Sequence, residues 1–410
     1  MRVSFYTLGC RMNQFDTDLM RSKFIESGYE VVSFEELADI YIVNTCTVTT
    51  GGDRSSRQAL YQAKRRNPKA VVVATGCYAQ VKPQELTSLN EVDLVVGNTH
   101  KSEILKLVEE FLEKKNKKAV VGEIFRQNEL KNFDTVLYFE ESRPFLKVQE
   151  GCNKFCTFCV IPFARGKVRS APKEKVIEQV KLLADRGFEE VVLSGTQLSQ
   201  YGWDIDSSLH ELLLDLLKVE GIKLIRLSSM HIKELSKELI ELIATEDRIA
   251  PHFHLSLQSG SDRILALMER GYTREDYLRV VNLILESRSE SAIGTDIIVG
   301  FPTESDKDFE DTYRFVEELP FAYLHVFPYS DRPFTKASKL KGKVQERVKK
   351  ERVRALNKLD SEKRTEFYRK NLGRKLRATV LGNGKLLTEN YISVERSTYA
   401  PPGRVVEVTL

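Results

Sequence analysis

The sequence GCNKFCTFC, residues 151–159, holds three cysteines in a Cys-x3-Cys-x2-Cys spacing directly after an apolar segment. A [4Fe-4S] cluster is normally bound by four thiolates, one for each iron. Three ligands in one short loop therefore leave one iron open to a ligand that the protein does not supply. An open metal position usually indicates chemistry. The loop thus predicts a reactive iron–sulfur centre held by Cys152, Cys156 and Cys159.

Zinc and a redox dithiol are the alternatives for this loop. A zinc site usually takes a fourth His or Cys close by, and the nearest histidine along the chain is His210. The spacing therefore favours an iron–sulfur cluster over zinc.

The other three cysteines, Cys10, Cys46 and Cys77, each follow an apolar, β-prone run. If those runs are parallel strands, the three thiols lie at the carboxyl ends of one sheet, where open α/β folds bind their ligands. Glycine precedes Cys10 and Cys77, and such turns let the backbone approach a ligand closely. A lone cysteine behind a strand is more often a small buried hydrophobe, and that alternative stays open for each one taken singly. Together they predict a second three-cysteine site.

The composition is that of an ordinary globular protein. At 410 residues we expect two to three domains, and a hydrophobic content of 41% supports compact cores rather than a disordered or fibrous chain. No apolar run reaches the roughly 18 residues of a membrane span, and the first residues open into a strand without a signal-peptide pattern. We therefore expect a cytoplasmic protein with no membrane partner, whose reduced cysteines bind metal or do chemistry.

The first part of the chain alternates strands and helices. Strands are expected at residues 3–8, 29–33, 39–44, 70–75 and 92–96, and helices at 15–27, 54–66 and 102–115. This order is typical of a doubly wound parallel α/β sheet. A lysine-rich stretch at 114–118 and an irregular segment up to Asp134 predict the boundary, so the first domain spans residues 1–134.

Beyond Arg143 and Pro144 a strand–helix unit repeats six times. Its strands are expected at residues 145–149, 191–194, 224–228, 253–257, 292–299 and 323–327. Among the helices between them, one begins at Pro172 and stops at Gly187, and another runs over residues 308–319. Six units predict a partial (β/α) barrel whose working face is at the carboxyl ends of the strands. With a charged helix at 347–370, this second domain spans residues 135–370.

The tail, residues 371–410, predicts a small all-β domain with strands at 375–381, 391–394 and 405–409. The whole chain has a net charge of +4, but residues 341–377 hold fifteen Lys or Arg and five Asp or Glu, a local charge of +10. A charged run is usually a solvated helix face. Next to a small β domain, however, it favours nucleic-acid binding.

Residues 151–170 also carry a resemblance to a known family. The pattern Gly-Cys-Asn-x-x-Cys-x-x-Cys, followed by Pro162, Arg165-Gly166 and Arg169-Ser170, strongly resembles radical S-adenosylmethionine methylthiotransferases. The resemblance covers nearly the whole chain and includes Leu8-Gly9-Cys10 with Asn13, Asn44-Thr45-Cys46, Thr75-Gly76-Cys77, Ser256-Leu257-Gln258-Ser259-Gly260, residues 296–302, and a tail similar to a TRAM domain around Thr388-Glu389-Asn390-Tyr391.

The resemblance implies an enzyme with two [4Fe-4S] clusters and S-adenosylmethionine. Cys10, Cys46 and Cys77 would bind an auxiliary cluster that carries the sulfur to be transferred. One S-adenosylmethionine would donate its methyl group to that sulfur, and another would be cleaved to a 5′-deoxyadenosyl radical that activates a C–H bond of the substrate. A reducing electron donor and a sulfur donor are implied as partners.

Finer marks indicate the substrate. LGCRMNQFDTD at residues 8–18 and NTCTVT at 44–49, with DRSSR at 53–57, look most like the branch that acts on C2 of N6-threonylcarbamoyladenosine at position 37, in the tRNA anticodon loop. Isopentenyladenosine-37 of tRNA and an aspartate of ribosomal protein S12 are the alternative substrates. Members of the favoured branch tend to carry Glu-Pro after a Ser-Ser pair, where this chain has Met230-His231-Ile232. That departure leaves the role of the Ser228-Ser229 loop open.

Candidate cofactor contacts lie at the strand ends that share a face with the cysteine loop. Amide and hydroxyl groups can bind ribose or carboxylate, and an aspartate can pair with a cation. A polar residue that caps a helix or turn is the alternative for each. The candidates for S-adenosylmethionine are Gln197, Ser229, Gln258, Asp296 and Tyr329, and no catalytic residue is assigned.

For the tRNA, the basic helix and the TRAM-like tail would contact phosphates, which set affinity and register rather than base choice. The target adenosine would be unstacked from its loop. Arg165 and Arg169 are further candidates for a phosphate or substrate contact. Alternatives of other classes are a cluster-bearing electron-transfer protein and a non-enzymatic RNA-binding protein with structural metal, but neither needs a six-unit barrel with an open-iron loop.

Overall fold

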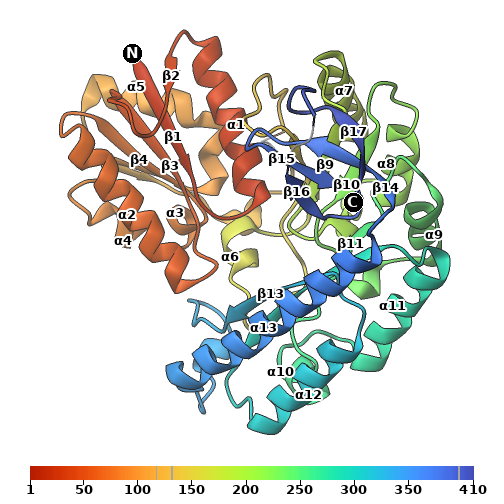
Figure 1. Ribbon diagram of the computed structural model, residues 1–410. Helices are drawn as coiled ribbons and strands as arrows, with labels where there is room; N and C mark the ends of the chain where they lie inside the picture. The colour runs from red at the N-terminus through yellow and green to blue at the C-terminus, as the bar shows by residue number, and fades with distance from the viewer. Residues whose placement is uncertain (117, 131–132, 396–397) are drawn as a thin grey trace.

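The computed structural model describes residues 1–116, 118–130, 133–395 and 398–410. Figure 1 shows an N-terminal α/β unit beside a second unit with curved strands, on which the C-terminal sheet lies. Within these residues every helix is too short or too polar to cross a membrane.

The N-terminal unit is a six-stranded parallel sheet in the order β2-β1-β3-β4-β5-β6. β3 and β4 are buried along their whole length, as is typical of parallel strands covered on both faces. The strands are β1 (Arg2–Thr7), β2 (Glu30–Val32), β3 (Ile40–Thr45), β4 (Val71–Gly76), β5 (Leu94–Val96) and β6 (Lys118–Val120).

Helices cover both faces of this sheet, which confirms the doubly wound fold. α1 and α5 pack on one face through Phe24 and Ile104, and α2 packs on the other through Leu60 and Ala63. The helices are α1 (Arg11–Glu26), α2 (Thr50–Arg66), α3 (Cys77–Val81), α4 (Pro83–Thr87), the 3-10 helix η1 (Asn98–Glu103) and α5 (Ile104–Lys114).

Strand β6 lies in the lysine-rich stretch that predicts the domain boundary. Its pairing with β5, Leu94 opposite Lys118, joins segments that no local pattern connects, so the sequence does not predict it. Lys117 and residues 131–132 of that boundary lie outside the described residues. The domain limits at 134 and 370 therefore stay predictions.

The second unit holds six parallel strands, as predicted: β7 (Phe145–Glu150), β9 (Glu190–Gly195), β10 (Leu224–Leu227), β11 (His252–His254), β12 (Ala292–Val299) and β13 (Tyr323–Pro328). They form two sheets, which parallel bridges Ile225–Ile249 and Met230–Leu255 connect at β10. The result is one partial barrel. A short strand that the sequence does not predict, β8 (Arg169–Ser170), runs antiparallel to β7.

Helices line the outer side of these strands (Figure 1). α7 begins one residue after Pro172 and ends before Gly187, as the sequence predicts. The 3-10 helix η2 (Ile124–Arg126) precedes the barrel, whose helices are α6 (Ile161–Arg165), α7 (Lys173–Asp185), η3 (Leu198–Gln200), α8 (Leu209–Leu216), η4 (Ile232–Glu234), α9 (Lys237–Thr245), α10 (Asp262–Leu267), α11 (Arg274–Ser287), α12 (Asp306–Glu318) and η5 (Ala337–Lys339).

The long helix α13 (Glu346–Lys370) packs on β13 and leads into the tail. The tail is a four-stranded antiparallel sheet in the order β16-β15-β14-β17, which confirms the small all-β unit. Its strands are β14 (Lys375–Val380), β15 (Lys385–Thr388), β16 (Ser393–Glu395) and β17 (Val405–Thr409). Of these, β15 is not predicted by the sequence.

Candidate functional site

The carboxyl ends of three neighbouring strands bring Cys10, Cys46 and Cys77 to one edge of the N-terminal sheet. Cys10 caps α1 after β1, Cys46 follows β3, and Cys77 opens α3 after β4. Gly9 has φ +95°, and a Cβ at Gly9 would lie 2.9 Å from Cys46 Sγ. Only glycine combines that backbone conformation with so close an approach, so the turn that precedes Cys10 is built to let the two cysteine loops meet.

Two asparagine side chains hold this edge in place. Asn13 Nδ2 donates to the carbonyls of Leu8 (2.7 Å) and Thr45 (3.1 Å), which ties the Cys10 and Cys46 loops together. Asn98 Nδ2 lies 3.7 Å from Cys77 Sγ and donates to the Ala164 carbonyl of α6 (2.8 Å). The third cysteine is thereby connected to the barrel.

The cysteine loop of residues 152–159 follows β7 at the carboxyl end of the barrel strands. Gly151 has φ +80°, and a Cβ there would collide with the Lys167 carbonyl. Arg270 Nη1 donates to Cys156 Sγ (3.2 Å), and its Nε donates to the Tyr272 hydroxyl (2.9 Å). Arg270 is therefore a buried cation in direct contact with one thiol of the loop.

Burial acts on thiols of both sets, Cys46 in one and Cys152 and Cys159 in the other. It raises the pKa of Cys46 and of Cys159 to about 12 and that of Cys152 to about 11, and neighbouring thiols of the same set act in the same direction. A thiol with so high a pKa becomes a thiolate only when a metal replaces its proton. Each set is thus a compact group of thiols that influence one another, as ligands of one metal centre must.

One cavity of about 570 Å³ joins the two sets, because Cys10 and Cys46 of one set and Cys159 of the other are among its lining residues. Most of its remaining wall is apolar, with Phe158, Val160, Ile161, Ile298 and Phe327 among the lining residues. The two cysteine sets therefore face a common space from which water can be displaced.

Three of the five predicted S-adenosylmethionine contacts, Gln258, Asp296 and Tyr329, line this cavity. The carboxylate of Asp296 accepts from Ser256 Oγ (2.9 Å) and lies 3.2 Å from both His254 Nε2 and His325 Nδ1. Burial acts to raise the pKa of Asp296, but the two imidazoles outweigh it and hold the pKa well below its usual range. Asp296 is therefore a carboxylate at neutral pH.

The other two predicted contacts are not among the residues that line the cavity. Gln197 Nε2 donates to Glu234 (2.7 Å) and Ser199 (3.0 Å), and Ser229 Oγ bonds His254 Nδ1. The structure thus places Gln197 in a polar cluster with η4 and Ser229 behind His254. Their role toward the cofactor stays a prediction.

The Met230-His231 segment, where the sequence departs from its family pattern, packs beside Arg270. The His231 ring makes an edge contact with Tyr272 at 5.2 Å. Burial, aided by the Arg270 charge, lowers the pKa of His231 to about 3, so this histidine is neutral at physiological pH.

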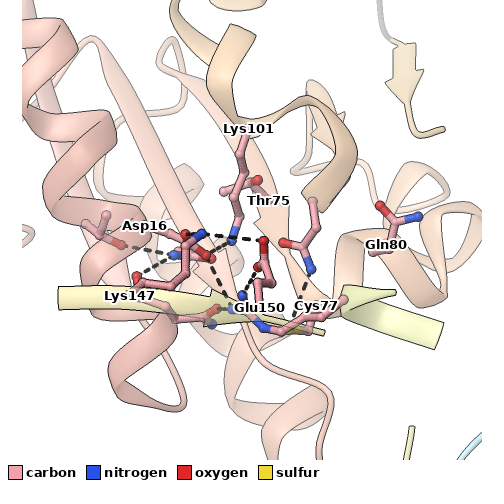
Figure 2. A network of polar contacts seen from close by, with 12 residues as sticks. Asp16, Thr75, Cys77, Gln80, Lys101, Lys147 and Glu150 are labelled. Atoms are coloured by element: carbon pink, nitrogen blue, oxygen red, sulfur yellow. Dashed lines mark hydrogen bonds and ion pairs between the residues drawn. The ribbon is translucent and has the colours of Figure 1, made fainter. Parts of the chain in front are cut away.

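A buried network of ion pairs lies between the N-terminal sheet and the barrel (Figure 2). Asp16 of α1 accepts from Lys101 (2.7 Å) and Lys147 (2.5 Å). Arg165 pairs with Asp16 and with Glu150, and Arg169 also pairs with Glu150. We call these six side chains, each no more than 5% exposed, the ion-pair network: Asp16, Lys101, Lys147, Glu150, Arg165 and Arg169.

The predicted phosphate contact of Arg165 and Arg169 is wrong. Both guanidinium groups are buried in the ion-pair network, so the backbone of a bound RNA cannot reach them. No local pattern indicates this burial, because their carboxylate partners come from α1 and from the residue that ends β7.

Two family models match the chain: the uncharacterized protein family UPF0004 over residues 2–97 and the radical SAM superfamily over residues 146–316. The chain is 70% identical over 410 residues to the threonylcarbamoyladenosine tRNA methylthiotransferase MtaB of Aquifex aeolicus (strain VF5), covering 100% of both chains. The chain belongs to this methylthiotransferase family. The MtaB of Bacillus subtilis (strain 168) is 41% identical over 89% of this chain and 81% of the relative.

Other matches are more distant. A tRNA-2-methylthio-N(6)-dimethylallyladenosine synthase of Staphylococcus haemolyticus is 37% identical over 86% of this chain and 70% of that protein. Among solved structures, the radical S-adenosylmethionine methyltransferase TsrM from Kitasatospora setae has a TM-score of 0.60 at 16% identity, covering 82% of this chain and 75% of that chain. This likeness shows the fold of the radical SAM unit. The family membership confirms the resemblance drawn from the cysteine motifs.

Sequence reasoning misses Arg270 and the lysines of the ion-pair network. Arg270 lies 114 residues from Cys156 along the chain, and Lys147 lies 131 residues from Asp16. One signal is present, since Lys147 alternates with apolar residues in a strand that precedes the cysteine loop. A lysine inside such a run indicates a buried partner.

Proposed function

We propose that the chain is a tRNA methylthiotransferase that adds a methylthio group to C2 of N6-threonylcarbamoyladenosine at position 37 by radical S-adenosylmethionine chemistry. The observation that carries the proposal is the single cavity lined by cysteines of both sets. A sulfur-bearing centre and a radical-generating centre must reach the same substrate carbon, and this cavity gives them a common space. The 70% identity to a relative named for this reaction supports the choice of nucleoside.

The donor set fits the two [4Fe-4S] clusters that the family uses together with S-adenosylmethionine. The chain has six cysteines, so each set of three lacks a fourth thiol and leaves one iron open. Cys10, Cys46 and Cys77 would hold the auxiliary cluster, and Cys152, Cys156 and Cys159 the cluster that binds S-adenosylmethionine. When bound, these groups supply the transferable sulfur and the radical that activates the C–H bond.

The chain's own residues would position the cofactor and keep water out. Asp296 offers a fixed negative charge to the cationic part of S-adenosylmethionine, and Gln258 and Tyr329 offer hydrogen bonds from the same wall. The apolar side chains Phe158, Ile298 and Phe327 shield the space between the two cysteine sets. Such shielding strengthens electrostatic contacts and protects a radical from side reactions.

We further propose the tRNA anticodon loop as the macromolecular partner, bound in the cytoplasm, with a reducing electron donor and a sulfur donor supplied from outside the chain. Exposed cations of α13 and the tail are the proposed phosphate contacts. The target base would leave its stack to enter the cavity, as for other enzymes that act on bases.

Mass spectrometry of tRNA nucleosides tests the proposal. The chain is expressed in cells that lack their own enzyme, beside the variants Cys46→Ala and Cys159→Ala and the surface control Lys307→Ala. We expect 2-methylthio-N6-threonylcarbamoyladenosine with the parent chain and the control, and its loss in both cysteine variants. If 2-methylthio-isopentenyladenosine appears instead, the chemistry stands and the substrate is wrong; if neither appears, ribosomal protein S12 is tested next.

A further inference from the structure

The ion-pair network holds more positive than negative charge. Its four cations pair only with Asp16 and Glu150, and within the described ranges no third carboxylate forms an ion pair with any of them. Two positive charges are therefore left over in a region closed to water. Burying an uncompensated charge is strongly unfavourable, so the network needs a further anion close by.

Two buried guanidinium nitrogens also indicate that the network needs a further anion close by. The Nε atoms of Arg165 and Arg169 are buried and have no hydrogen-bond partner among the residues that the structure describes. Arg165 Nη2 donates to Asn13 Oδ1 (2.6 Å), and Arg169 Nη2 donates to the Arg165 carbonyl (2.5 Å). Buried guanidinium donors normally find an acceptor, so these groups have capacity that the described chain does not fill.

The excess charge lies beside the N-terminal cysteines. The side-chain oxygen of Asn13 accepts a hydrogen bond from Arg165. The side-chain nitrogen of Asn13 donates to the carbonyl of Thr45, the residue just before Cys46. Asn98 connects Cys77 Sγ to the Ala164 carbonyl, just before Arg165. Each link from the network to the cysteine edge is a single side chain. Asp16 itself follows Cys10 by less than two turns of α1.

We propose that the ion-pair network is the counter-ion of the auxiliary cluster and favours an anionic sulfur species, hydrosulfide or methanethiolate, as the ligand of its open iron. This inference rests on the proposed function, because it takes Cys10, Cys46 and Cys77 as cluster ligands. The three cysteines alone do not indicate the charge state of the sulfur ligand. The ion-pair network indicates that charge state and identifies the residues that set it.

With an anionic sulfur ligand, the negative charge of the auxiliary cluster balances the excess positive charge of the ion-pair network. Three thiolates around a doubly positive cluster core leave one negative charge, and an anionic sulfur ligand makes it two, which equals the excess of the network. A neutral thiol would leave one positive charge unmatched. A thiol that binds as an anion releases its proton to solvent, and neither iron nor sulfur changes oxidation state in this exchange of ligands.

A clamp without electrostatic function is the alternative. Lys147 and Glu150 belong to β7 and Asp16 to α1, so the network also joins the two units of the chain. A clamp and a counter-ion predict different changes in the cluster reduction potential and in methanethiol affinity when cations and anions of the network are removed one at a time.

The test uses the full-length chain with Cys152, Cys156 and Cys159 replaced by alanine, so that reconstitution loads only the auxiliary site. Lys101→Met removes a positive charge, Asp16→Asn removes a negative one, and Lys101→Arg conserves the charge. The readouts are the cluster reduction potential, from an anaerobic titration followed by EPR, and the affinity for methanethiol. Net charge and hydrogen bonding around a cluster set its potential.

We expect Lys101→Met to lower the potential and to weaken methanethiol binding by about tenfold or more, since tenfold corresponds to only ~1.4 kcal/mol. Asp16→Asn should shift both quantities the opposite way, and Lys101→Arg should stay close to the parent. Shifts in the same direction for Lys101→Met and Asp16→Asn, or no shift in either, would overturn the proposal.

Urea unfolding of the metal-free chain gives a second readout that needs no cluster loading. Without an anion at the cysteine edge the excess positive charge persists, so Asp16→Asn should destabilise the chain much more than Lys101→Met. Equal losses of stability would identify a clamp and contradict the counter-ion role. None of these measurements involves tRNA, so a failed nucleoside assay leaves them unaffected and the two proposals can fail separately.

Discussion

Asp296 is the charged residue among the predicted S-adenosylmethionine contacts that line the cavity. It is a carboxylate on the cavity wall, held by Ser256 and flanked by His254 and His325. If its charge pairs with the cationic part of S-adenosylmethionine, removing that charge weakens binding while the shape of the side chain is kept. Charge-assisted hydrogen bonds are worth about 1.5–3 kcal/mol.

We therefore expect Asp296→Asn to weaken S-adenosylmethionine binding by about tenfold or more in anaerobic equilibrium dialysis of the cluster-loaded chain. Asp311→Asn, on α12 and paired with Lys307, is the matched control and should bind as the parent does. Unchanged binding in Asp296→Asn would mean that the carboxylate serves only to orient the two histidines.

Asp18, on α1, makes stability depend on pH. Burial raises its pKa to about 7, although Arg21 lies 3.0 Å away and acts in the opposite direction. Because the folded-state pKa exceeds the usual value of 3.8, protonated Asp18 stabilises the fold at low pH. That contribution is lost as the pH rises through about 7.

Asp18→Asn removes this dependence. Relative to the parent, the variant should gain stability between pH 4 and pH 8, by up to about 4 kcal/mol if the whole shift is realised. Urea unfolding at both pH values measures the difference, with Asp311→Asn as the reference. Parallel stability curves for Asp18→Asn and the parent would contradict the raised pKa.

The loop of residues 388–391 packs against the barrel strands. Arg226 of β10 donates to the carbonyls of Thr388 (3.0 Å) and Glu389 (2.8 Å). The Tyr391 ring stacks on His252 at 4.4 Å and lies 5.2 Å from Tyr323. Tyr391 holds φ +72°, a conformation that a non-glycine residue keeps only where its surroundings enforce it. The segment that marks the TRAM-like tail in the sequence is thus its docking point on the barrel.

Tyr391→Ala should therefore release the tail. We expect a decrease of about 2 kcal/mol or more in stability, because an aromatic side chain leaves a packed site, together with faster proteolysis within residues 371–410. Tyr399, which is fully exposed, provides the control substitution Tyr399→Ala. Equal protease resistance in the two variants would show that the loop does not secure the tail.

The extent of the basic helix α13 can be predicted from the sequence, but the burial of its cations cannot. Its extent is predicted to within one residue, because α13 begins at Glu346 and ends at Lys370. The local charge does not reveal that Lys349, Arg352 and Lys363 are buried. Arg352 pairs with Glu304 (2.5 Å) and Asp306 (2.8 Å), and Lys363 donates to carbonyls at the end of α12 and just after it.

The candidate site likewise has features that the sequence predicts and features that it does not. Glycine turns and strand ends are local, so the sequence predicts the strand ends at which each set of three cysteines lies, but not that the two sets face one cavity. Partners such as Asp53 and Arg332, 2.8 Å apart, are separated by 279 residues. No periodicity within one element reports such a pair. Buried charge networks and the residues that line a shared cavity are set by how the units pack, and this is why they could not be predicted.

The two cysteine sites meet because α3 and α6 pack together. Cys77 and Val81 of α3 contact Val160 and Ala164 at α6 in one small apolar cluster. Arg332 adds a second link, donating to Asp53 and to the Thr47 carbonyl next to Cys46. The geometry of the shared cavity therefore depends on both units of the chain at once.

The tRNA must approach this assembly from outside, and exposed cations decide how strongly salt weakens its binding. Lys350, Arg354 and Arg369 are exposed on α13, and in the described part of the chain none of them forms an ion pair, unlike Arg347 and Arg364 on the same helix. They are the charges that the local excess of the sequence leaves available to phosphates. The logarithm of the binding constant, log Kobs, falls as log salt rises. Removing one cation that binds a phosphate should make this slope less steep by about 0.7–0.9.

We expect replacement of these three residues by glutamine to weaken binding of a tRNA anticodon stem-loop and to reduce the salt slope by about 2, measured by fluorescence anisotropy over a series of salt concentrations. Lys175→Gln with Lys181→Gln, exposed on α7, removes two cations from another surface; compared per cation removed, this control should leave the slope unchanged. If both variants reduce the slope equally, the attraction comes from the general charge of the surface. If neither does, the RNA reaches the cavity by another face, and the excess positive charge of α13 serves to hold the helix on the barrel.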